Sequence, residues 1–178
     1  MMSCVSMERT KECTKCGVPK PISAFSKHRL SPDGYAYQCK ECNAKRAKIW
    51  RGTPTGIYTN IKGRENHRKR KPFEITKEQF LEWYENEPKL CRYCEISEEN
   101  APLMRKYFGA HGIQLSIDCK DNSLGYVLGN MVLACDRCNF IKSNIFTYEE
   151  MLVIGQQYIK SKWMAFPEVT KQRKGGEE

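Results

Sequence analysis

The sequence predicts a small α+β protein whose folded parts are organised around groups of four cysteines. Eight of the ten cysteines in the 178-residue chain form four Cys-x-x-Cys pairs. Short apolar segments bounded by turn residues occur between segments of helical composition, which is typical of mixed α+β structure. A chain of this length can bury one modest core or two small ones. We therefore expect two small units joined by a connector.

Composition excludes several classes of protein. Forty per cent of the residues are hydrophobic, and sixteen Tyr and Phe accompany three Trp, which is too many for a disordered chain. No apolar run approaches the ~20 residues that span a bilayer. Met1–Lys11 contains no apolar stretch typical of a signal peptide. We expect a protein that has no membrane partner and stays in a reducing cytoplasm.

The cysteine pairs indicate two structural zinc sites. Two thiolates three residues apart can occupy adjacent corners of a tetrahedron. A disulfide framework is the competing interpretation, and it does not suit a reducing compartment. A redox motif would need only one pair. Pairing in chain order leaves Cys4 and Cys119 over and gives one site of Cys13, Cys16, Cys39 and Cys42, and a second of Cys91, Cys94, Cys135 and Cys138.

The order of motifs predicts the domain boundaries. Gly52–Gly56 contains two glycines and a proline, which break the helix expected over Lys40–Arg51. A second basic helix is expected over Ile57–Lys71, with few residues available for burial. We predict an N-terminal zinc ribbon or knuckle over 10–51, a basic helical linker over 52–72, a second unit over 73–165 and a disordered tail over 166–178.

The net charge of the chain, +9, lies in one segment. Asn43–Pro72 contains ten basic residues and one acid, whereas the remaining residues are balanced. Such a concentration favours a polyanionic partner, although a basic helix that is merely solvated is the alternative. The residues expected to bind nucleic acid in this segment are Lys45, Arg46, Lys48, Arg51, Arg64, Arg68, Lys69 and Arg70.

The second unit shows a strand, a loop, a strand and a helix in that order. The elements we expect are a helix capped by Thr76–Gln79, a strand around Leu115–Ile117, a loop over Asp121–Gly129, a strand over Met131–Ala134, a helix over Asp136–Asn144 and a final helix capped by Thr147. Cys135 and Cys138 fall at the start of the fifth element. A zinc ion held there would fix the end of that helix.

This segment resembles the HNH endonuclease family, the ββα-metal nucleases, in its four-cysteine form. The resemblance covers roughly residues 73–160. It includes Cys91-Arg-Tyr-Cys94, an aspartate at 118 in the first strand, Asn130 at the start of the second strand, and Cys-Asn-x-x-Lys over Cys138–Lys142. The arrangement is similar to phage or mobile-element members, for which the host cytoplasm is the expected location.

The resemblance implies a catalytic metal and its ligands. Asp118 and Asn139 match the residues that hold Mg²⁺ (or Mn²⁺), and Asn130 matches the asparagine that braces the loop. Oxygen ligands suit a hard cation, and two protein ligands leave positions for phosphate and water. Lys142 and Arg137 would face double-stranded DNA if the helix lies in the minor groove. A monomer and a homodimer are both compatible with the sequence.

The general base is the point at which the sequence departs from the family. The usual histidine after the strand aspartate is replaced by Cys119, and Asp118–Asp121 is similar to a branch that carries Asp-Arg-x-Asp. A thiolate near a metal can accept a proton, because a cation lowers the pKa of a cysteine. The alternatives are His111, Tyr107, Tyr126, Asp121 and bulk water.

The sequence leaves three alternative functions. The first is a Mg²⁺-dependent HNH endonuclease that nicks or cuts double-stranded DNA, with Asp118, Cys119, His111, Asn130 and Asn139 as candidate catalytic residues. The second is a zinc-stabilised DNA-binding protein with an inactive HNH site. The third, an RNA-binding zinc protein, has no aromatic stacking motif in its favour.

Overall fold

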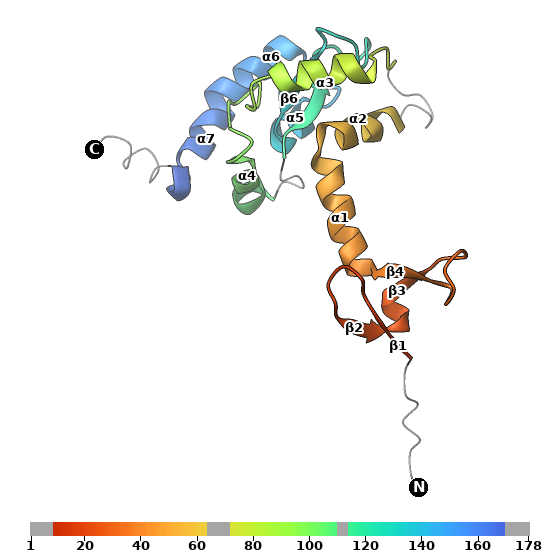
Figure 1. Ribbon diagram of the computed structural model, residues 1–178. Helices are drawn as coiled ribbons and strands as arrows, with labels where there is room; N and C mark the ends of the chain where they lie inside the picture. Colours follow the sequence, from red (N-terminus) through yellow and green to blue (C-terminus); the bar gives the residue numbers. More distant parts are fainter. Residues whose placement is uncertain (1–8, 64–71, 110–113, 170–178) are drawn as a thin grey trace. The chain divides into compact units, whose positions relative to one another are not determined.

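The structure, a computed structural model, describes residues 9–63, 72–109 and 114–169. It divides into two compact units, Met1–Ile57 and Tyr58–Glu178, and each is described by itself (Figure 1). Both are small mixtures of short strands and helices, so the expected α+β class is confirmed. Four site residues from the basic segment (Arg64, Arg68, Lys69 and Arg70) and His111 lie outside the described residues.

The first unit contains two antiparallel hairpins around a cysteine cluster. Its elements are β1 (Thr10–Glu12), β2 (Pro19–Pro21), the 3-10 turn η1 (Ile22–Ala24), β3 (Phe25–Lys27) and β4 (Tyr35–Cys39). β1 pairs with β2, and β3 pairs with β4. The chain reverses over Ser31–Gly34, where the Gly34 N–H donates to the Ser31 carbonyl and Gly34 has φ +77°. Cys13, Phe25 and Cys39 form the small core.

Two helices follow β4, with a break between them at a single residue. α1 (Lys40–Gly52) ends where the Thr53 N–H donates to the Trp50 carbonyl. α2 (Pro54–Gly63) begins at once, with proline at its first position, where no N–H is required. Gly56 is needed at this break because a Cβ there would lie 1.9 Å from the Trp50 carbonyl oxygen. The predicted break is therefore present, but it is narrower than Gly52–Gly56.

One face of the second half of α2 is buried, which corrects the expectation that little of this helix is covered. Tyr58 and Ile61 are buried. The Tyr58 ring lies 5.4 Å from that of Phe73 and 5.5 Å from that of Phe80, and its hydroxyl donates to the Ile75 carbonyl. These aromatic contacts make the second turn of α2 part of the second unit rather than a free linker.

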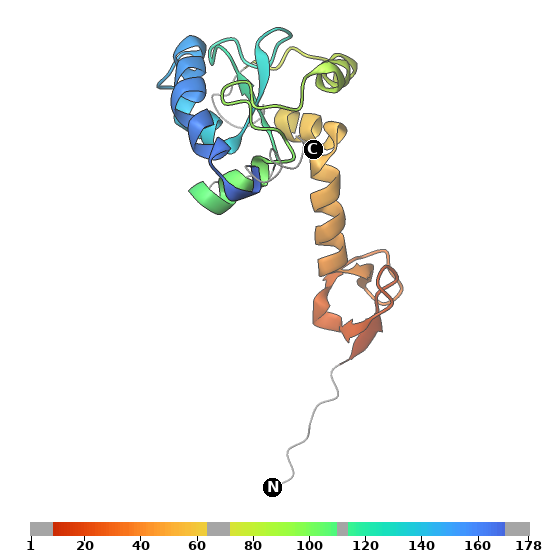
Figure 2. The same ribbon diagram turned by 90° about the vertical axis from the view of Figure 1, so that its left-hand side faces the viewer.

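The second unit is built on a two-stranded hairpin covered by helices. β5 (Ser116–Cys119) pairs antiparallel with β6 (Met131–Ala134), and α5 (Asp136–Lys142) follows directly. This is the predicted strand, loop, strand and helix order. In Figure 2 the hairpin lies between α3 (Lys77–Asn86) on one side and α6 (Tyr148–Ile154) with α7 (Lys160–Met164) on the other.

The helices start where capping residues predict. Thr76 and Thr147 each accept a backbone N–H and complete a capping box, with Gln79 and Glu150 respectively. The π-helical turn η2 (Gly155–Ile159) joins α6 to α7. α4 (Ala101–Phe108) was not predicted. Among the described residues, no helix combines the length and the apolar character needed to cross a membrane.

The first residues of the predicted disordered tail are folded, so its start at 166 is wrong. Phe166 and Val169 are buried, and the Phe166 ring stacks on Tyr107 with centroids 4.1 Å apart. Glu168 accepts a hydrogen bond from the Tyr107 hydroxyl at 2.8 Å. The second unit therefore extends at least to Val169, and residues 170–178 lie outside the described part.

Candidate active site and zinc centres

The first cysteine cluster brings together the four predicted ligands of the N-terminal unit. The sulfur atoms of Cys13, Cys16, Cys39 and Cys42 lie within 4.8 Å of one another. The Cys39 N–H donates to the Cys13 sulfur at 3.3 Å, and this is the main reason that the pKa of Cys13 is lowered to about 6. The side-chain contact with Cys39 raises the pKa of Cys42 to about 12. Thiols crowded in this way ionise together only around a cation, which fits zinc.

The second cluster is fully enclosed. Its four sulfur atoms also lie within 4.8 Å of one another, and all four residues are buried. The sulfurs of Cys94 and Cys135 are 3.8 Å apart, which equals the edge of roughly 3.8 Å of a tetrahedron with Zn–S bonds of about 2.3 Å. Cys135 also caps α5 by accepting the Cys138 N–H. The site therefore suits a structural zinc ion that fixes the start of α5.

The Cys91–Cys94 turn carries a tyrosine into the interior. The Arg92 N–H donates to the Leu133 carbonyl and holds the turn against β6. Tyr93 is fully buried, and its hydroxyl donates to Oδ2 of Asp118 at 2.6 Å. Burial, followed by the nearby carboxylate, raises the pKa of Tyr93, so the phenol stays protonated and donates. Sequence reasoning missed this residue because the zinc turn explains its position without any role for its side chain.

Asp118 lies in a buried network with a lysine from α5. Asp118 is 5% exposed, and Nζ of Lys142 lies 3.3 Å from its Oδ2. The same ammonium donates to the Cys119 carbonyl at 2.7 Å. Lys142 is only 1% exposed, so it cannot contact DNA, and its assignment as a DNA-binding residue is wrong. Its charge instead compensates that of a buried carboxylate.

Ser116 fixes the orientation of the Asn139 side chain. The Ser116 hydroxyl donates its single proton to the Ala134 carbonyl at 3.0 Å, so it can only accept from Asn139. The Asn139 Nδ2 group donates to it at 2.9 Å. The amide nitrogen therefore points to the Ser116 hydroxyl, and the carbonyl oxygen Oδ1 is the end of the amide that does not contact it. This oxygen is the atom that a hard cation would bind.

Residues of β5 contact residues of α5 in the same order along both elements. Ser116 and Asp118 are two residues apart on β5 and share one face of the hairpin. Asn139 and Lys142 are three residues apart on α5 and share one face of that helix. Asn139 meets Ser116, and Lys142 meets Asp118. The two expected metal ligands thus lie at the same contact between β5 and α5.

Comparison with solved structures decides the family. The chain is similar to the rare-cutting HNH restriction endonuclease PacI, with 30% sequence identity and a TM-score of 0.52 over 85% of this chain and 94% of that one. This chain belongs to the HNH endonuclease family. No protein-family model and no curated protein sequence matches it. Together with the two cysteine clusters, the match confirms the predicted four-cysteine HNH fold.

In this HNH chain, Asn130 holds the loop between the strands. It is buried, and its Oδ1 accepts the Asp121 N–H at 2.9 Å. Its Nδ2 donates to the carbonyls of Asp121 and Gly125 at 2.9 and 2.7 Å. Gly125 has φ +72°, and a Cβ there would lie 2.2 Å from the Pro72 carbonyl oxygen. The three hydrogen bonds of the Asn130 side chain therefore hold the loop that follows β5.

The candidate bases of the HNH site have different surroundings. Cys119 is fully buried. A general base must contact the attacking water, so this burial argues against the Cys119 sulfur as the base. Asp121 accepts from the Ser123 hydroxyl and N–H, which lowers the pKa of its carboxyl. Tyr107 binds Glu168, and the Tyr126 ring lies 5.9 Å from that of Phe73. The contacts named here for Asp121, Tyr107 and Tyr126 involve neither Asp118 nor Asn139, and the identity of the base stays a prediction.

The basic residues of the HNH chain also differ in exposure. Lys45, Arg46, Lys48 and Arg51 are exposed on α1, a helix without any buried residue. Arg137 was expected to face nucleic acid, but its guanidinium donates to the Phe108 carbonyl and its Nε is buried. The basic side chains of α1 are therefore accessible to a ligand, whereas Arg137 and Lys142 of α5 contact other residues of the protein.

Proposed function

We propose that this chain hydrolyses phosphodiester bonds in double-stranded DNA with Mg²⁺ or Mn²⁺ held by Asp118 and Asn139. The observation that carries the proposal is the contact between β5 and α5, where a carboxylate and an oriented amide lie together in an HNH fold. PacI, to which the chain is similar, is a restriction endonuclease and therefore acts on DNA. The exposed cations of α1 supply a surface suited to phosphate.

The donor set fits a hard divalent cation. Tyr93 and Lys142 both contact Oδ2 of Asp118, so we assign the cation to Oδ1 of Asp118 and to Oδ1 of Asn139. Oxygen ligands of this kind are those that Mg²⁺ and Mn²⁺ prefer. When bound, the cation would stabilise the charge that develops on the phosphate and on the leaving oxygen. Tyr93 and Lys142 hold the carboxylate, and Ser116 holds the amide.

Replacing Asp118 with asparagine tests this function. Asp118→Asn keeps the side-chain shape while removing the negative charge, and we expect Mg²⁺-dependent nicking of supercoiled plasmid to fall at least about 100-fold. DNA binding, measured by gel shift, should stay within about twofold. Thermal unfolding followed by circular dichroism checks that the variant is folded.

The matched control is Glu82→Gln, which removes an exposed carboxylate from α3 of the same unit. It should leave both nicking and binding unchanged. Undiminished cleavage by Asp118→Asn would contradict the assignment. A wild-type protein that binds DNA but cuts it with neither Mg²⁺ nor Mn²⁺ would leave only a DNA-binding function.

Ser116 should control metal affinity through Asn139. In Ser116→Ala the amide of Asn139 loses its acceptor and rotates freely, so we expect Mn²⁺ affinity, measured by titration calorimetry, to fall about tenfold. Ser116→Thr keeps the hydroxyl and should retain most of the affinity. The control Ser161→Ala removes an exposed hydroxyl on α7 and should change nothing. Equal Mn²⁺ affinity for wild type and Ser116→Ala would remove Ser116 from the site.

A further inference from the structure

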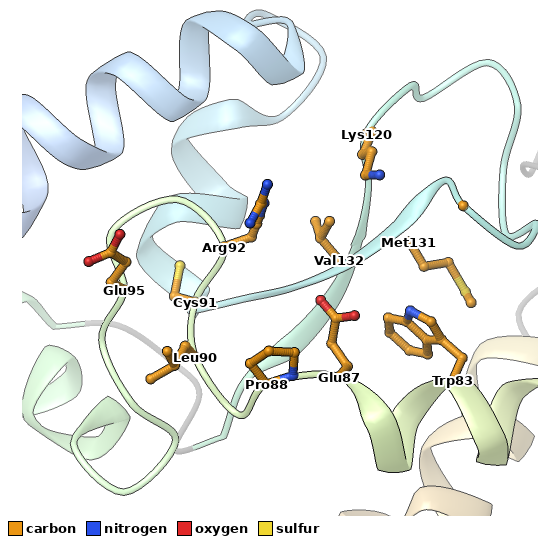
Figure 3. A pocket seen from close by; sticks show the side chains of 11 residues that line it. Trp83, Glu87, Pro88, Leu90, Cys91, Arg92, Glu95, Lys120, Met131 and Val132 are labelled. Atoms are coloured by element: carbon orange, nitrogen blue, oxygen red, sulfur yellow. The ribbon is translucent and has the colours of Figure 1, made fainter.

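A hollow of about 530 Å³ lies in the second unit between α3, the Cys91–Cys94 turn and the hairpin (Figure 3). This volume is within the range of small-molecule sites, roughly 300–1,000 Å³. The lining residues on which the argument depends are Trp83, Glu87, Arg92, Lys120, Met131 and Val132.

The hollow adjoins the candidate metal site. Val132 in its wall is the cross-strand partner of Asp118, and directly opposite residues of a hairpin point to the same face. Lys120 follows Asp118 by two residues, and Arg92 precedes Tyr93, which binds the Asp118 carboxylate. The wall of the hollow is therefore built partly from the chain and cross-strand neighbours of Asp118 and Tyr93.

Tyr148 brings two cations to the rim of the hollow. Its hydroxyl accepts a hydrogen bond from Nε of Arg92 at 2.8 Å. Nζ of Lys120 lies 5.6 Å from the centre of its ring, within the range of a cation–π contact. Figure 3 shows both basic side chains on the hairpin side of the hollow, away from Trp83. Two cations anchored by one tyrosine form a place for a phosphate group.

The opposite part of the wall is suited to a nucleobase. Trp83 is half-buried, and its indole packs against Phe80 with centroids 5.6 Å apart, so its position on α3 is fixed. Met131, which lies beside Trp83 in Figure 3, adds an apolar surface. Glu87, one turn beyond Trp83, supplies an acceptor for the amino or imino group of a base. The carboxylate and the cations lie at different parts of the wall, as the two ends of a nucleotide require.

We propose that this hollow binds one unstacked nucleotide of the DNA strand, with its base against Trp83 and its phosphate on Arg92 and Lys120. An aromatic wall binds any base through its π face, and extraction from the helix is needed because a paired base cannot enter a recess. The inference rests on the proposed function, since it takes DNA as the ligand of the second unit. It adds a contact that selects and holds the strand beside Asp118.

Photocrosslinking tests the proposal directly. A duplex cut from a plasmid region that the wild-type protein nicks is prepared with 5-iodouracil at each thymine in turn. It is bound in Ca²⁺, irradiated and digested. We expect one position near the cut to crosslink to the peptide that contains Trp83. If a preparation that cuts the duplex in Mg²⁺ and binds it in Ca²⁺ crosslinks to this peptide at no position, the proposal is overturned.

Variants give a second, independent measurement on the full chain. Trp83→Ala should weaken duplex binding about tenfold, whereas Trp83→Phe, which keeps an aromatic face, should stay within about twofold. Arg92→Gln and Lys120→Gln should each weaken binding at least threefold, and Lys106→Gln, an exposed cation on α4, should have no effect. Unchanged binding by folded Trp83→Ala would contradict the proposal while leaving the nuclease assignment intact. If the wild-type protein binds no DNA, both the nucleotide site and the nuclease assignment are wrong.

Discussion

Cys138→Ser is expected to unfold the second unit. A structural zinc site contributes apparent free energies of about 10–16 kcal/mol, which is comparable to or larger than the ~5–15 kcal/mol that stabilises a typical domain. Cys138 is fully buried at the start of α5, and the other three ligands come from the 91–94 turn and from Cys135. Loss of this zinc would release the turn that carries Tyr93 and the helix that carries Lys142. The candidate site would be lost with the fold.

Metal content and thermal unfolding measure this effect. The wild-type chain should contain two zinc ions, and Cys138→Ser should contain one, with no cooperative unfolding transition for the second unit. The matched control is Cys119→Ala, which removes a thiol that is equally buried but outside both clusters. It should keep two zinc ions and lose only about 1 kcal/mol of stability. A folded Cys138→Ser chain that keeps two zinc ions would show that Cys138 is not a required zinc ligand.

Local sequence patterns predicted the elements that depend on local physics. Cys-x-x-Cys spacing fixes the positions of two thiolates regardless of the rest of the fold, so both four-cysteine groups could be paired in advance. The capping boxes at Thr76 and Thr147 depend on three residues each, and both helices begin where they predict. The hairpin and α5 follow from alternation and from the cysteines at the start of the helix.

Features that depend on contacts between distant segments could not be predicted. Lys142 belongs to a motif, but its burial depends on Asp118, which lies 24 positions earlier in the chain. A lysine near the end of a short helix is ordinarily solvated, so the sequence gives no signal of an internal charge. Phe166 ends the short apolar run Trp163–Phe166, but its burial depends on stacking against Tyr107 of α4, an element without a clear pattern. Tyr58 was missed for the same reason.

Removing the charge of Lys142 is expected to be strongly destabilising. Lys142→Met keeps the length and apolar stem of the side chain but leaves the Asp118 carboxylate buried with Tyr93 as its remaining described donor. Breaking a buried ion pair by removing one partner costs about 3–5 kcal/mol, because the other charge stays desolvated. The Cys119 carbonyl also loses its donor. We expect this loss in denaturant unfolding of the zinc-loaded protein.

The double variant Asp118→Asn, Lys142→Met separates the charge from the packing. Neutralising both partners removes the uncompensated carboxylate, so most of the lost stability should return although the contact is still absent. Lys106→Met is the surface control, because its pair with Glu168 is exposed and should contribute no more than about 1 kcal/mol. If Lys142→Met and Lys106→Met cost the same, Lys142 does not compensate Asp118. The role of α5 in the proposed metal site would then be limited to Asn139.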